Sequence, residues 1–139
     1  MGCLNSIVVP ADVSAVWAKL SDFHDLSWAL GVAESCEKVG DTPGSERGAK
    51  RIVNGAMHET LLGIDNEKRA FRYSIDSAPG TPIDSTTGYV GVVRVFPVTT
   101  TGETFVIWTS SWASGGEGVE EFCTPIYQGL LEALVKSFA

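Results

Sequence analysis

The chain has 139 residues, with 10 Lys or Arg against 17 Asp or Glu, so its formal net charge at pH 7 is −7. A chain of this length forms one domain, residues 1–139, with a sizeable hydrophobic core. The acidic balance and the absence of any Lys/Arg-rich run argue against nucleic acid or an anionic membrane as the main partner. No apolar run approaches the roughly 18 residues of a membrane-spanning helix, and we expect no secretory signal peptide.

The three cysteines, Cys3, Cys36 and Cys123, are far apart and do not have the spacing of metal ligands. Reduced thiols in a cytoplasmic protein are the simplest interpretation. The opening Met1-Gly2-Cys3 also fits an N-myristoylation pattern with a neighbouring palmitoylation position. We favour a chance match, because so short a pattern arises often and a strand is predicted to begin almost at once.

The N-terminal part of the chain predicts one strand and two short helices. Leu4–Val9 is apolar and β-branched, so it is predicted as a strand that Pro10 ends. Asp12 is a suitable N-cap for a helix from Val13 to Leu20, which has one apolar face. A second short helix is expected from His24 to Leu30.

From residue 32 onward the apolar residues alternate with polar ones, which predicts strands. The six predicted strands are Val32–Val39, Glu46–Val53, Ala56–Ile64, Ala70–Asp76, Thr86–Val98 and Glu103–Ser114. Asn54-Gly55 is the preferred pair for a two-residue hairpin turn, and short polar clusters separate most of the other strands. Because successive strands are joined by turns, we expect an antiparallel sheet.

The run from Gly116 to Ala139 predicts a long amphipathic helix, because its apolar residues recur at spacings of three and one. Ser114 and Glu117 match a capping box at its start. Such a helix needs a broad apolar partner, and the preceding strands supply one. The predicted fold class is α+β: a curved antiparallel sheet wrapped around the C-terminal helix, with two short helices after the first strand.

Several short motifs resemble one family in their order along the chain. They are Val9-Pro10-Ala11-Asp12, Val16-Trp17, Leu20-Ser21-Asp22-Phe23, Trp28, Gly44-Ser45-Glu46-Arg47, Glu59-Thr60-Leu61, Asp65, Tyr73-Ser74-Ile75, Pro82 and Val106-Ile107-Trp108. This set, which spans nearly the whole chain, resembles the START-related polyketide cyclase/dehydrase and lipid-transport proteins of the SRPBCC superfamily. The resemblance implies the helix-grip fold, in which a seven-stranded sheet and the last helix enclose a cavity. It does not imply one reaction, since members include carriers, cyclases, hydrolytic enzymes and regulatory modules.

The hairpin turns predict which side chains face the interior. A two-residue loop at Asn54-Gly55 pairs Val53 with Ala56 and therefore Lys50 with Glu59. Across the following turn, Leu61 is expected beside Tyr73, and Glu59 beside Ile75. The residues expected on the inner face of the last hairpin are Tyr89, Gly91, Val93, Val95, Val106, Trp108, Ser110 and Trp112.

The predicted inner face is aromatic and largely apolar, with hydroxyl and indole donors. A cavity of this character suits a planar or lipid-like ligand of modest size. The residues expected to contact such a ligand are Trp28, Met57, Glu59, Tyr73, Tyr89, Trp108, Trp112, Phe122, Ile126 and Tyr127. The alternative is that these side chains simply fill the core; the cavity that the resemblance implies favours the ligand.

Glu59 is the principal polar candidate, since a carboxylate on an inner sheet face is costly unless it is paired. Lys50 is its predicted partner, and Arg47, which matches the family's basic position, is the alternative if the third strand is bulged. The pair is either a structural link between strands or a ligand anchor. As a third interpretation, Glu59 is a general acid or base that transfers protons with Tyr73 or His24.

No metal or cofactor is expected, because the two histidines lack cysteine support and no nucleotide-binding motif is present. The leading hypothesis is a protein that binds or transports a small hydrophobic molecule. The second is an enzyme of the cyclase/dehydrase type, and the third is a protein-interaction module like those of the superfamily's co-chaperone branch. The sequence does not distinguish a monomer from a homodimer, nor does it name the ligand.

Overall fold

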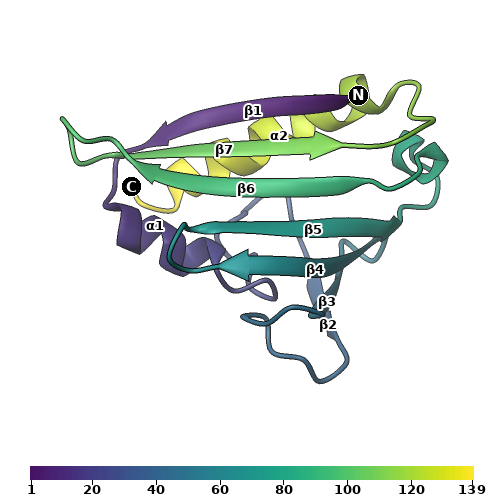
Figure 1. Ribbon diagram of the computed structural model, residues 1–139, viewed down its shortest axis with the longest axis horizontal. Coiled ribbons are helices and arrows are strands. Elements are labelled where there is room, and N and C mark those ends of the chain that lie inside the picture. Colours follow the sequence, from purple (N-terminus) through teal and green to yellow (C-terminus); the bar gives the residue numbers. More distant parts are fainter.

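The computed structural model describes residues 1–139, and its elements form one sheet with a long helix packed against it (Figure 1). Along the chain they are β1 (Gly2–Val9), α1 (Val13–Leu20), β2 (Cys36–Val39), β3 (Lys50–Val53), β4 (Met57–Asp65), β5 (Ala70–Ser77), the 3₁₀-helix η1 (Pro82–Ser85), β6 (Val90–Pro97), β7 (Thr104–Ser111) and α2 (Val119–Lys136). No helix is long and apolar enough to cross a membrane.

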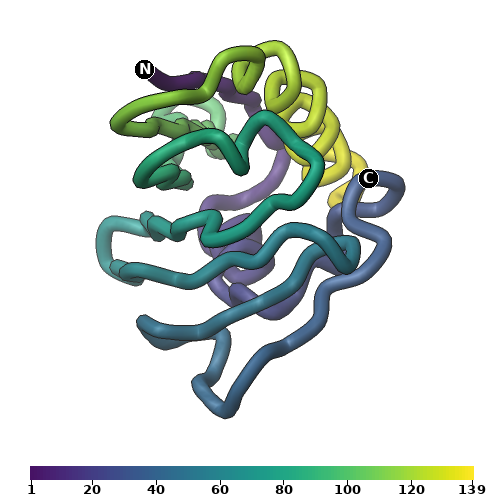
Figure 2. The backbone as a smooth tube through the Cα atoms, turned by 90° about the vertical axis from the view of Figure 1, so that its right-hand side faces the viewer, coloured from purple at the N-terminus to yellow at the C-terminus, as the bar shows by residue number.

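The seven strands form an antiparallel sheet in the order β1-β7-β6-β5-β4-β3-β2. Strands β2 to β7 are neighbours in chain order, and β1 closes the other edge by pairing with β7 from Gly2↔Ser111 to Val9↔Thr104. Figure 2 shows the strands curving around the interior while α2 lies along one side. The predicted α+β class and the helix-grip architecture are therefore confirmed.

Helix α1 has the predicted bounds, and its start is capped as the sequence indicates. The Asp12 carboxylate accepts a hydrogen bond from the backbone N–H of Ser14 at 3.0 Å. The indole N–H of Trp17 donates to Asn66 Oδ1 at 3.0 Å, which ties the helix to the turn between β4 and β5. The residues that α1 buries are Val16, Trp17 and Leu20.

The prediction of a second short helix from His24 to Leu30 is wrong, because this segment consists of turns. The carboxylates of Asp22 and Asp25 accept hydrogen bonds from the backbone N–H groups of His24 and Ser27, at 3.0 and 2.9 Å. Such bonds from a side chain to the backbone two residues later favour turns over a helix. The apolar residues of the segment are nevertheless buried, namely Phe23, Leu26, Trp28 and Ala29.

The capping box predicted at Ser114 and Glu117 is also wrong, because α2 begins only at Val119. Its N-cap is Gly118 in the left-handed region, at φ 80°, without a side-chain cap. The preceding glycines also have positive φ, so the chain arrives in a conformation that a helix cannot continue. Helix α2 buries Val119, Cys123, Tyr127, Leu131, Ala133 and Leu134.

The turn between β3 and β4 differs from the prediction by one residue. Ala56 N–H donates to the Val53 carbonyl at 3.1 Å, as an Asn-Gly turn requires, yet Val53 pairs with Met57 in the ladder. Ala56 is thus an extra residue, and one extra residue moves β3 onto its other face. Arg51 therefore lies opposite Glu59, and the predicted Lys50–Glu59 pairing is wrong.

The other register predictions are confirmed. Leu61 pairs with Tyr73 and Glu59 with Ile75, while the last hairpin places Val93 opposite Trp108. The inner faces of these strands carry an aromatic core in which neighbouring ring centroids lie 5.6–6.4 Å apart. Its members are Trp17, Phe23, Phe71, Tyr73, Trp108 and Tyr127.

Candidate functional site

A cavity of about 150 Å³ lies between the sheet and α2, and 13 of its 16 lining residues are hydrophobic. Its lining comes from the loop before β2, strands β3, β4, β5 and β7, η1 and one face of α2. The residues are Leu26, Val32, Ala33, Arg51, Val53, Asn54, Met57, Glu59, Tyr73, Ile75, Ile83, Trp108, Cys123, Ile126, Tyr127 and Leu130.

The lining divides into a buried floor and a half-buried rim. The buried lining residues form the floor; they are Leu26, Arg51, Glu59, Tyr73, Ile83, Trp108, Cys123 and Tyr127. The half-buried lining residues come from the loop before β2, the strand ends beside the β3–β4 turn, β5 and α2; they are Val32, Ala33, Val53, Met57, Ile75, Ile126 and Leu130. The cavity is therefore least covered along these segments.

Asn54 holds two of the rim segments together. Its Oδ1 accepts hydrogen bonds from the backbone N–H groups of Glu34 and Ser35 at 2.7 and 3.2 Å. Its Nδ2 donates to the carbonyl of Val32 at 3.0 Å, and its own N–H donates to the carbonyl of Ser35 at 2.9 Å. One residue at φ 54° thus clamps the loop before β2 to the β3–β4 turn.

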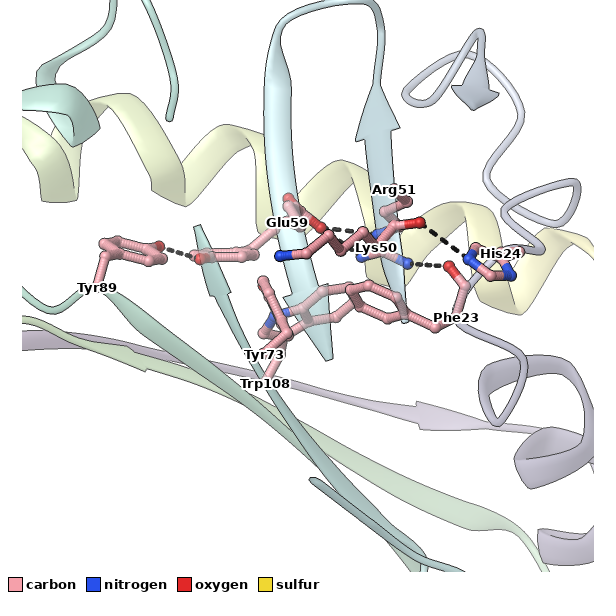
Figure 3. A network of polar contacts seen from close by, with 9 residues as sticks. Phe23, His24, Lys50, Arg51, Glu59, Tyr73, Tyr89 and Trp108 are labelled. Atoms are coloured by element: carbon pink, nitrogen blue, oxygen red, sulfur yellow. Dashed lines mark hydrogen bonds and ion pairs between the residues drawn. The ribbon is translucent and has the colours of Figure 1, made fainter. Parts of the chain in front are cut away.

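The polar part of the floor is a buried ion pair between neighbouring strands (Figure 3). Arg51 Nη2 lies 2.7 Å from Glu59 Oε1, and Arg51 Nε donates to the same oxygen at 2.8 Å. The two side chains are only 5% and 8% exposed, so water screens the pair weakly. Removing one partner of such a pair leaves a buried charge without compensation.

Further contacts orient the guanidinium of Arg51. Its Nη1 donates to the carbonyl of Phe23 at 2.8 Å, and its central carbon lies 3.8 Å from the centroid of the Phe23 ring. A cation over an aromatic face is stabilised by the electrons of the ring. The turn that replaces the expected second helix therefore supplies both the carbonyl and the ring that position Arg51.

Only one oxygen of the Glu59 carboxylate is used by the protein. Both contacts from Arg51 reach Oε1, and no hydrogen bond is formed to Oε2. Fully buried polar side-chain atoms without a partner occur only in Asn5, Trp28, Ser110 and Trp112. Glu59 Oε2 has no partner and is not one of these atoms, so it keeps some accessible surface. Because Glu59 lines the cavity, this oxygen is a free hydrogen-bond acceptor at the cavity wall.

The tyrosine hydroxyls of the floor are uncharged hydrogen-bonding groups. Tyr73 OH accepts from the indole N–H of Trp108 at 2.9 Å, and the hydroxyls of Tyr89 and Tyr127 bind each other. Burial raises the pKa of Tyr73 and of Tyr127 well above the usual value near 10. Burial likewise raises the pKa of the Cys123 thiol. These groups therefore stay protonated near neutral pH.

The sequence matches the family model described as polyketide cyclase/dehydrase and lipid transport over residues 5–139. The chain belongs to this family. No curated protein matches the sequence.

Several solved structures share the fold of this chain. A protein from Nitrosospira multiformis is 38% identical, with a TM-score of 0.95 over 100% of this chain and 97% of that one. XoxI from Bacillus cereus is 22% identical, with a TM-score of 0.79 over 99% and 94% of the two chains. Ara h 8.0201 is 13% identical, with a TM-score of 0.77 over 98% and 95%. At the last two identities the likeness shows the shared fold alone.

In this family member, most of the residues predicted to contact a ligand lie at the cavity. Those that line it are Met57, Glu59, Tyr73, Trp108, Ile126 and Tyr127. Tyr89 and Trp112 lie farther along the sheet and stack on each other, with ring centroids 5.9 Å apart. Trp28 borders a separate surface depression beside Lys19 and Lys136, and Phe122 is half-buried on α2 without lining the cavity.

The structure does not bring the remaining candidate residues to the cavity. His24 Nε2 donates to the backbone carbonyl of Lys50 at 2.9 Å, on the side away from Glu59 (Figure 3). The Lys50 ammonium donates to Thr60 Oγ1 at 2.8 Å on the outer face of the sheet, and Arg47 is exposed. The prediction of Lys50 or Arg47 as the ion-pair partner is therefore wrong, because the extra residue in the β3–β4 turn places Arg51 there.

Sequence reasoning missed several residues of the site, above all Arg51 and Asn54. Lys50 and Arg51 are adjacent in the sequence, so either could be the partner of Glu59. The number of residues in the β3–β4 turn determines which of the two lies opposite Glu59. Asn54 was recognised as a turn residue, but its bonds to residues 32–35 cross from one loop to another. The one available signal was that Asn54 begins an Asn-Gly turn, where asparagine adopts the left-handed conformation. This signal predicts the turn but not the bonds to the neighbouring loop.

Proposed function

We propose that this protein binds and carries a small, largely hydrophobic molecule in the cavity between the sheet and α2. The observation that supports the proposal most is a cavity of about 150 Å³ that the side chains leave unfilled. Close packing is the norm in protein interiors, so an unfilled apolar space forfeits contacts that a ligand would restore. Membership of a family described by polyketide cyclase/dehydrase and lipid-transport activities supports the same function.

Binding is favoured over catalysis by the groups that line the cavity. The charge of Glu59 is balanced by Arg51, and the other proton-bearing groups are Tyr73, Cys123 and Tyr127, whose raised pKa values make them poor bases at neutral pH. A cyclase or dehydrase needs a second acid or base close to the reacting atoms. His24 does not supply it, because it lies outside the cavity.

The proposal is tested by native mass spectrometry of the purified protein, followed by solvent extraction of any bound compound. The matched variants are Ile75→Trp, which fills the cavity, and Ile107→Trp on the outer face of the sheet. Both residues are half-buried strand isoleucines, so the two changes are chemically the same.

We expect the adduct to disappear in Ile75→Trp and to persist in Ile107→Trp, with both variants folded. If the wild-type protein gives a clean apo mass and a panel of fatty acids, flavonoids and simple aromatic compounds produces no thermal shift, the binding function is refuted. That result would turn attention to the role of a protein-interaction module. An adduct that Ile75→Trp retains would place the ligand elsewhere on the protein.

A further inference from the structure

The volume of the cavity limits the size of its ligand. Pockets for drug-sized ligands measure about 300–1,000 Å³, whereas an engineered protein cavity of about 150 Å³ accepts one benzene molecule. The cavity of this protein, at about 150 Å³, therefore has room for a single ring with one small substituent. An acyl chain or a fused polycyclic molecule would extend through the rim into solvent.

The walls favour a flat aromatic ring over a flexible aliphatic molecule. Tyr73 and Trp108 meet edge to face, with their planes at 88° and their centroids 6.4 Å apart. Tyr127 from α2 packs directly against Trp108, with ring centroids 5.6 Å apart, so the three rings form one continuous aromatic wall. Rings at such angles present both edges and faces, and aromatic pairs gain stability in these arrangements beyond the area that they bury.

The ion pair adds a requirement for a hydrogen-bond donor. The bonded atoms of the Arg51 guanidinium reach Glu59 Oε1 and the carbonyl of Phe23, whereas Glu59 Oε2 stays free at the cavity wall. A ligand hydroxyl or amine can donate to that oxygen in a charge-assisted bond. An anionic ligand would instead meet a carboxylate inside a protein whose net charge is −7.

We propose that the cavity selects a single-ring aromatic molecule with one hydroxyl or amino group, whose N–H or O–H donates to Glu59 Oε2. This inference rests on the proposed binding function and names the class of ligand. Phenol and aniline are the simplest members of the class. Toluene has the shape of phenol but no hydrogen-bond donor, so it is the matched compound. We expect toluene to bind more weakly than phenol.

The test compares phenol and toluene by calorimetric titration of two double variants and the wild-type protein. Arg51→Met with Glu59→Leu replaces both ionic partners by apolar side chains, a change that buried ion pairs tolerate better than the loss of one partner. Lys50→Met with Thr60→Val is the control, because this bonded pair occupies the adjacent cross-strand position on the outer face.

We expect the ratio of phenol to toluene affinity to fall about tenfold or more in the first variant, as loss of a hydrogen bond to a charged group predicts. The control should keep the wild-type ratio, and benzoate should not bind. An unchanged ratio would overturn the inference while leaving the binding function intact. Exclusive binding of larger ligands would do the same, whereas the absence of any ligand would refute the binding function itself.

Discussion

Raising the pH above 10 should unfold this protein through its tyrosines. The chain has three tyrosines, Tyr73, Tyr89 and Tyr127, and all of them are buried in the same region, with exposed fractions of 2%, 2% and 4%. Burial raises the pKa of each hydroxyl above the usual value near 10. No exposed tyrosine is present to ionise independently of the fold.

The sign and the size of the effect follow from proton binding. In the unfolded chain a tyrosine loses its proton near pH 10, whereas the folded protein keeps it to higher pH. Between these two pKa values the folded state binds more protons, so the free energy of unfolding falls as the pH rises. Three such groups give a slope of up to about 4 kcal/mol per pH unit. A domain stability of about 5–15 kcal/mol is then lost within roughly one to four pH units.

The assay follows tyrosinate absorbance and far-UV circular dichroism in one alkaline titration. We expect the two signals to change together, in a single transition steeper than that of a free tyrosine. Tyr89→Phe with Tyr127→Phe removes both partners of one hydroxyl pair, so the slope should fall to about a third. Tyrosinate that forms with a midpoint near pH 10 while the dichroism stays native would refute the reasoning.

Three further changes test the architecture of the site by urea unfolding. Arg51→Met should lower the free energy of unfolding by about 3–5 kcal/mol, because it leaves the Glu59 carboxylate buried without a partner. Adding Glu59→Leu should recover most of that loss, and equal losses in the single and double variants would contradict the pairing. Asn54→Ala should cost about 1–3 kcal/mol and speed amide exchange in residues 32–35, and unchanged exchange there would show that the clamp does not hold the loop. Gly91→Ala should lower the free energy of unfolding by about 1–3 kcal/mol, because its Cβ would overlap the buried ring of Tyr73. Gly63→Ala is the control and should be tolerated, because its Cβ would lie 3.7 Å from the Arg72 Nε atom. Similar losses in the two variants would count against this packing.

The fold could be predicted because its signals are local and repeated. Alternation along each strand, the apolar stripe of α2 and the Asp12 cap depend on residues close together in the chain. Boundaries were less accurate where side chains compete with the backbone. Asp22 and Asp25 hold turns in place of the expected helix, and positive-φ glycines delay the start of α2.

The site was harder to predict because it depends on contacts between distant segments. Alternation shows which face of a strand a residue occupies, but it does not show how far along the sheet the cavity extends. Tyr89 and Trp112 are on the buried side as predicted, yet they stack on each other beyond the cavity. The partner of Glu59 changed from Lys50 to Arg51 because of one extra residue, Ala56, in a turn whose sequence signal was otherwise correct.

The geometry of the Arg51–Glu59 pair leaves one carboxylate oxygen without a donor from the protein. A pair that served only to join two strands would gain most from a bidentate arrangement, in which each carboxylate oxygen accepts from a different nitrogen. Here both guanidinium contacts reach Oε1, and Oε2 is left at the wall of an aromatic cavity. An acceptor that is charged, largely shielded from water and without a protein partner is stabilised when a donor enters the cavity. In the ligand class proposed above, the same residue would join β3 to β4 and accept the hydrogen bond of the ligand.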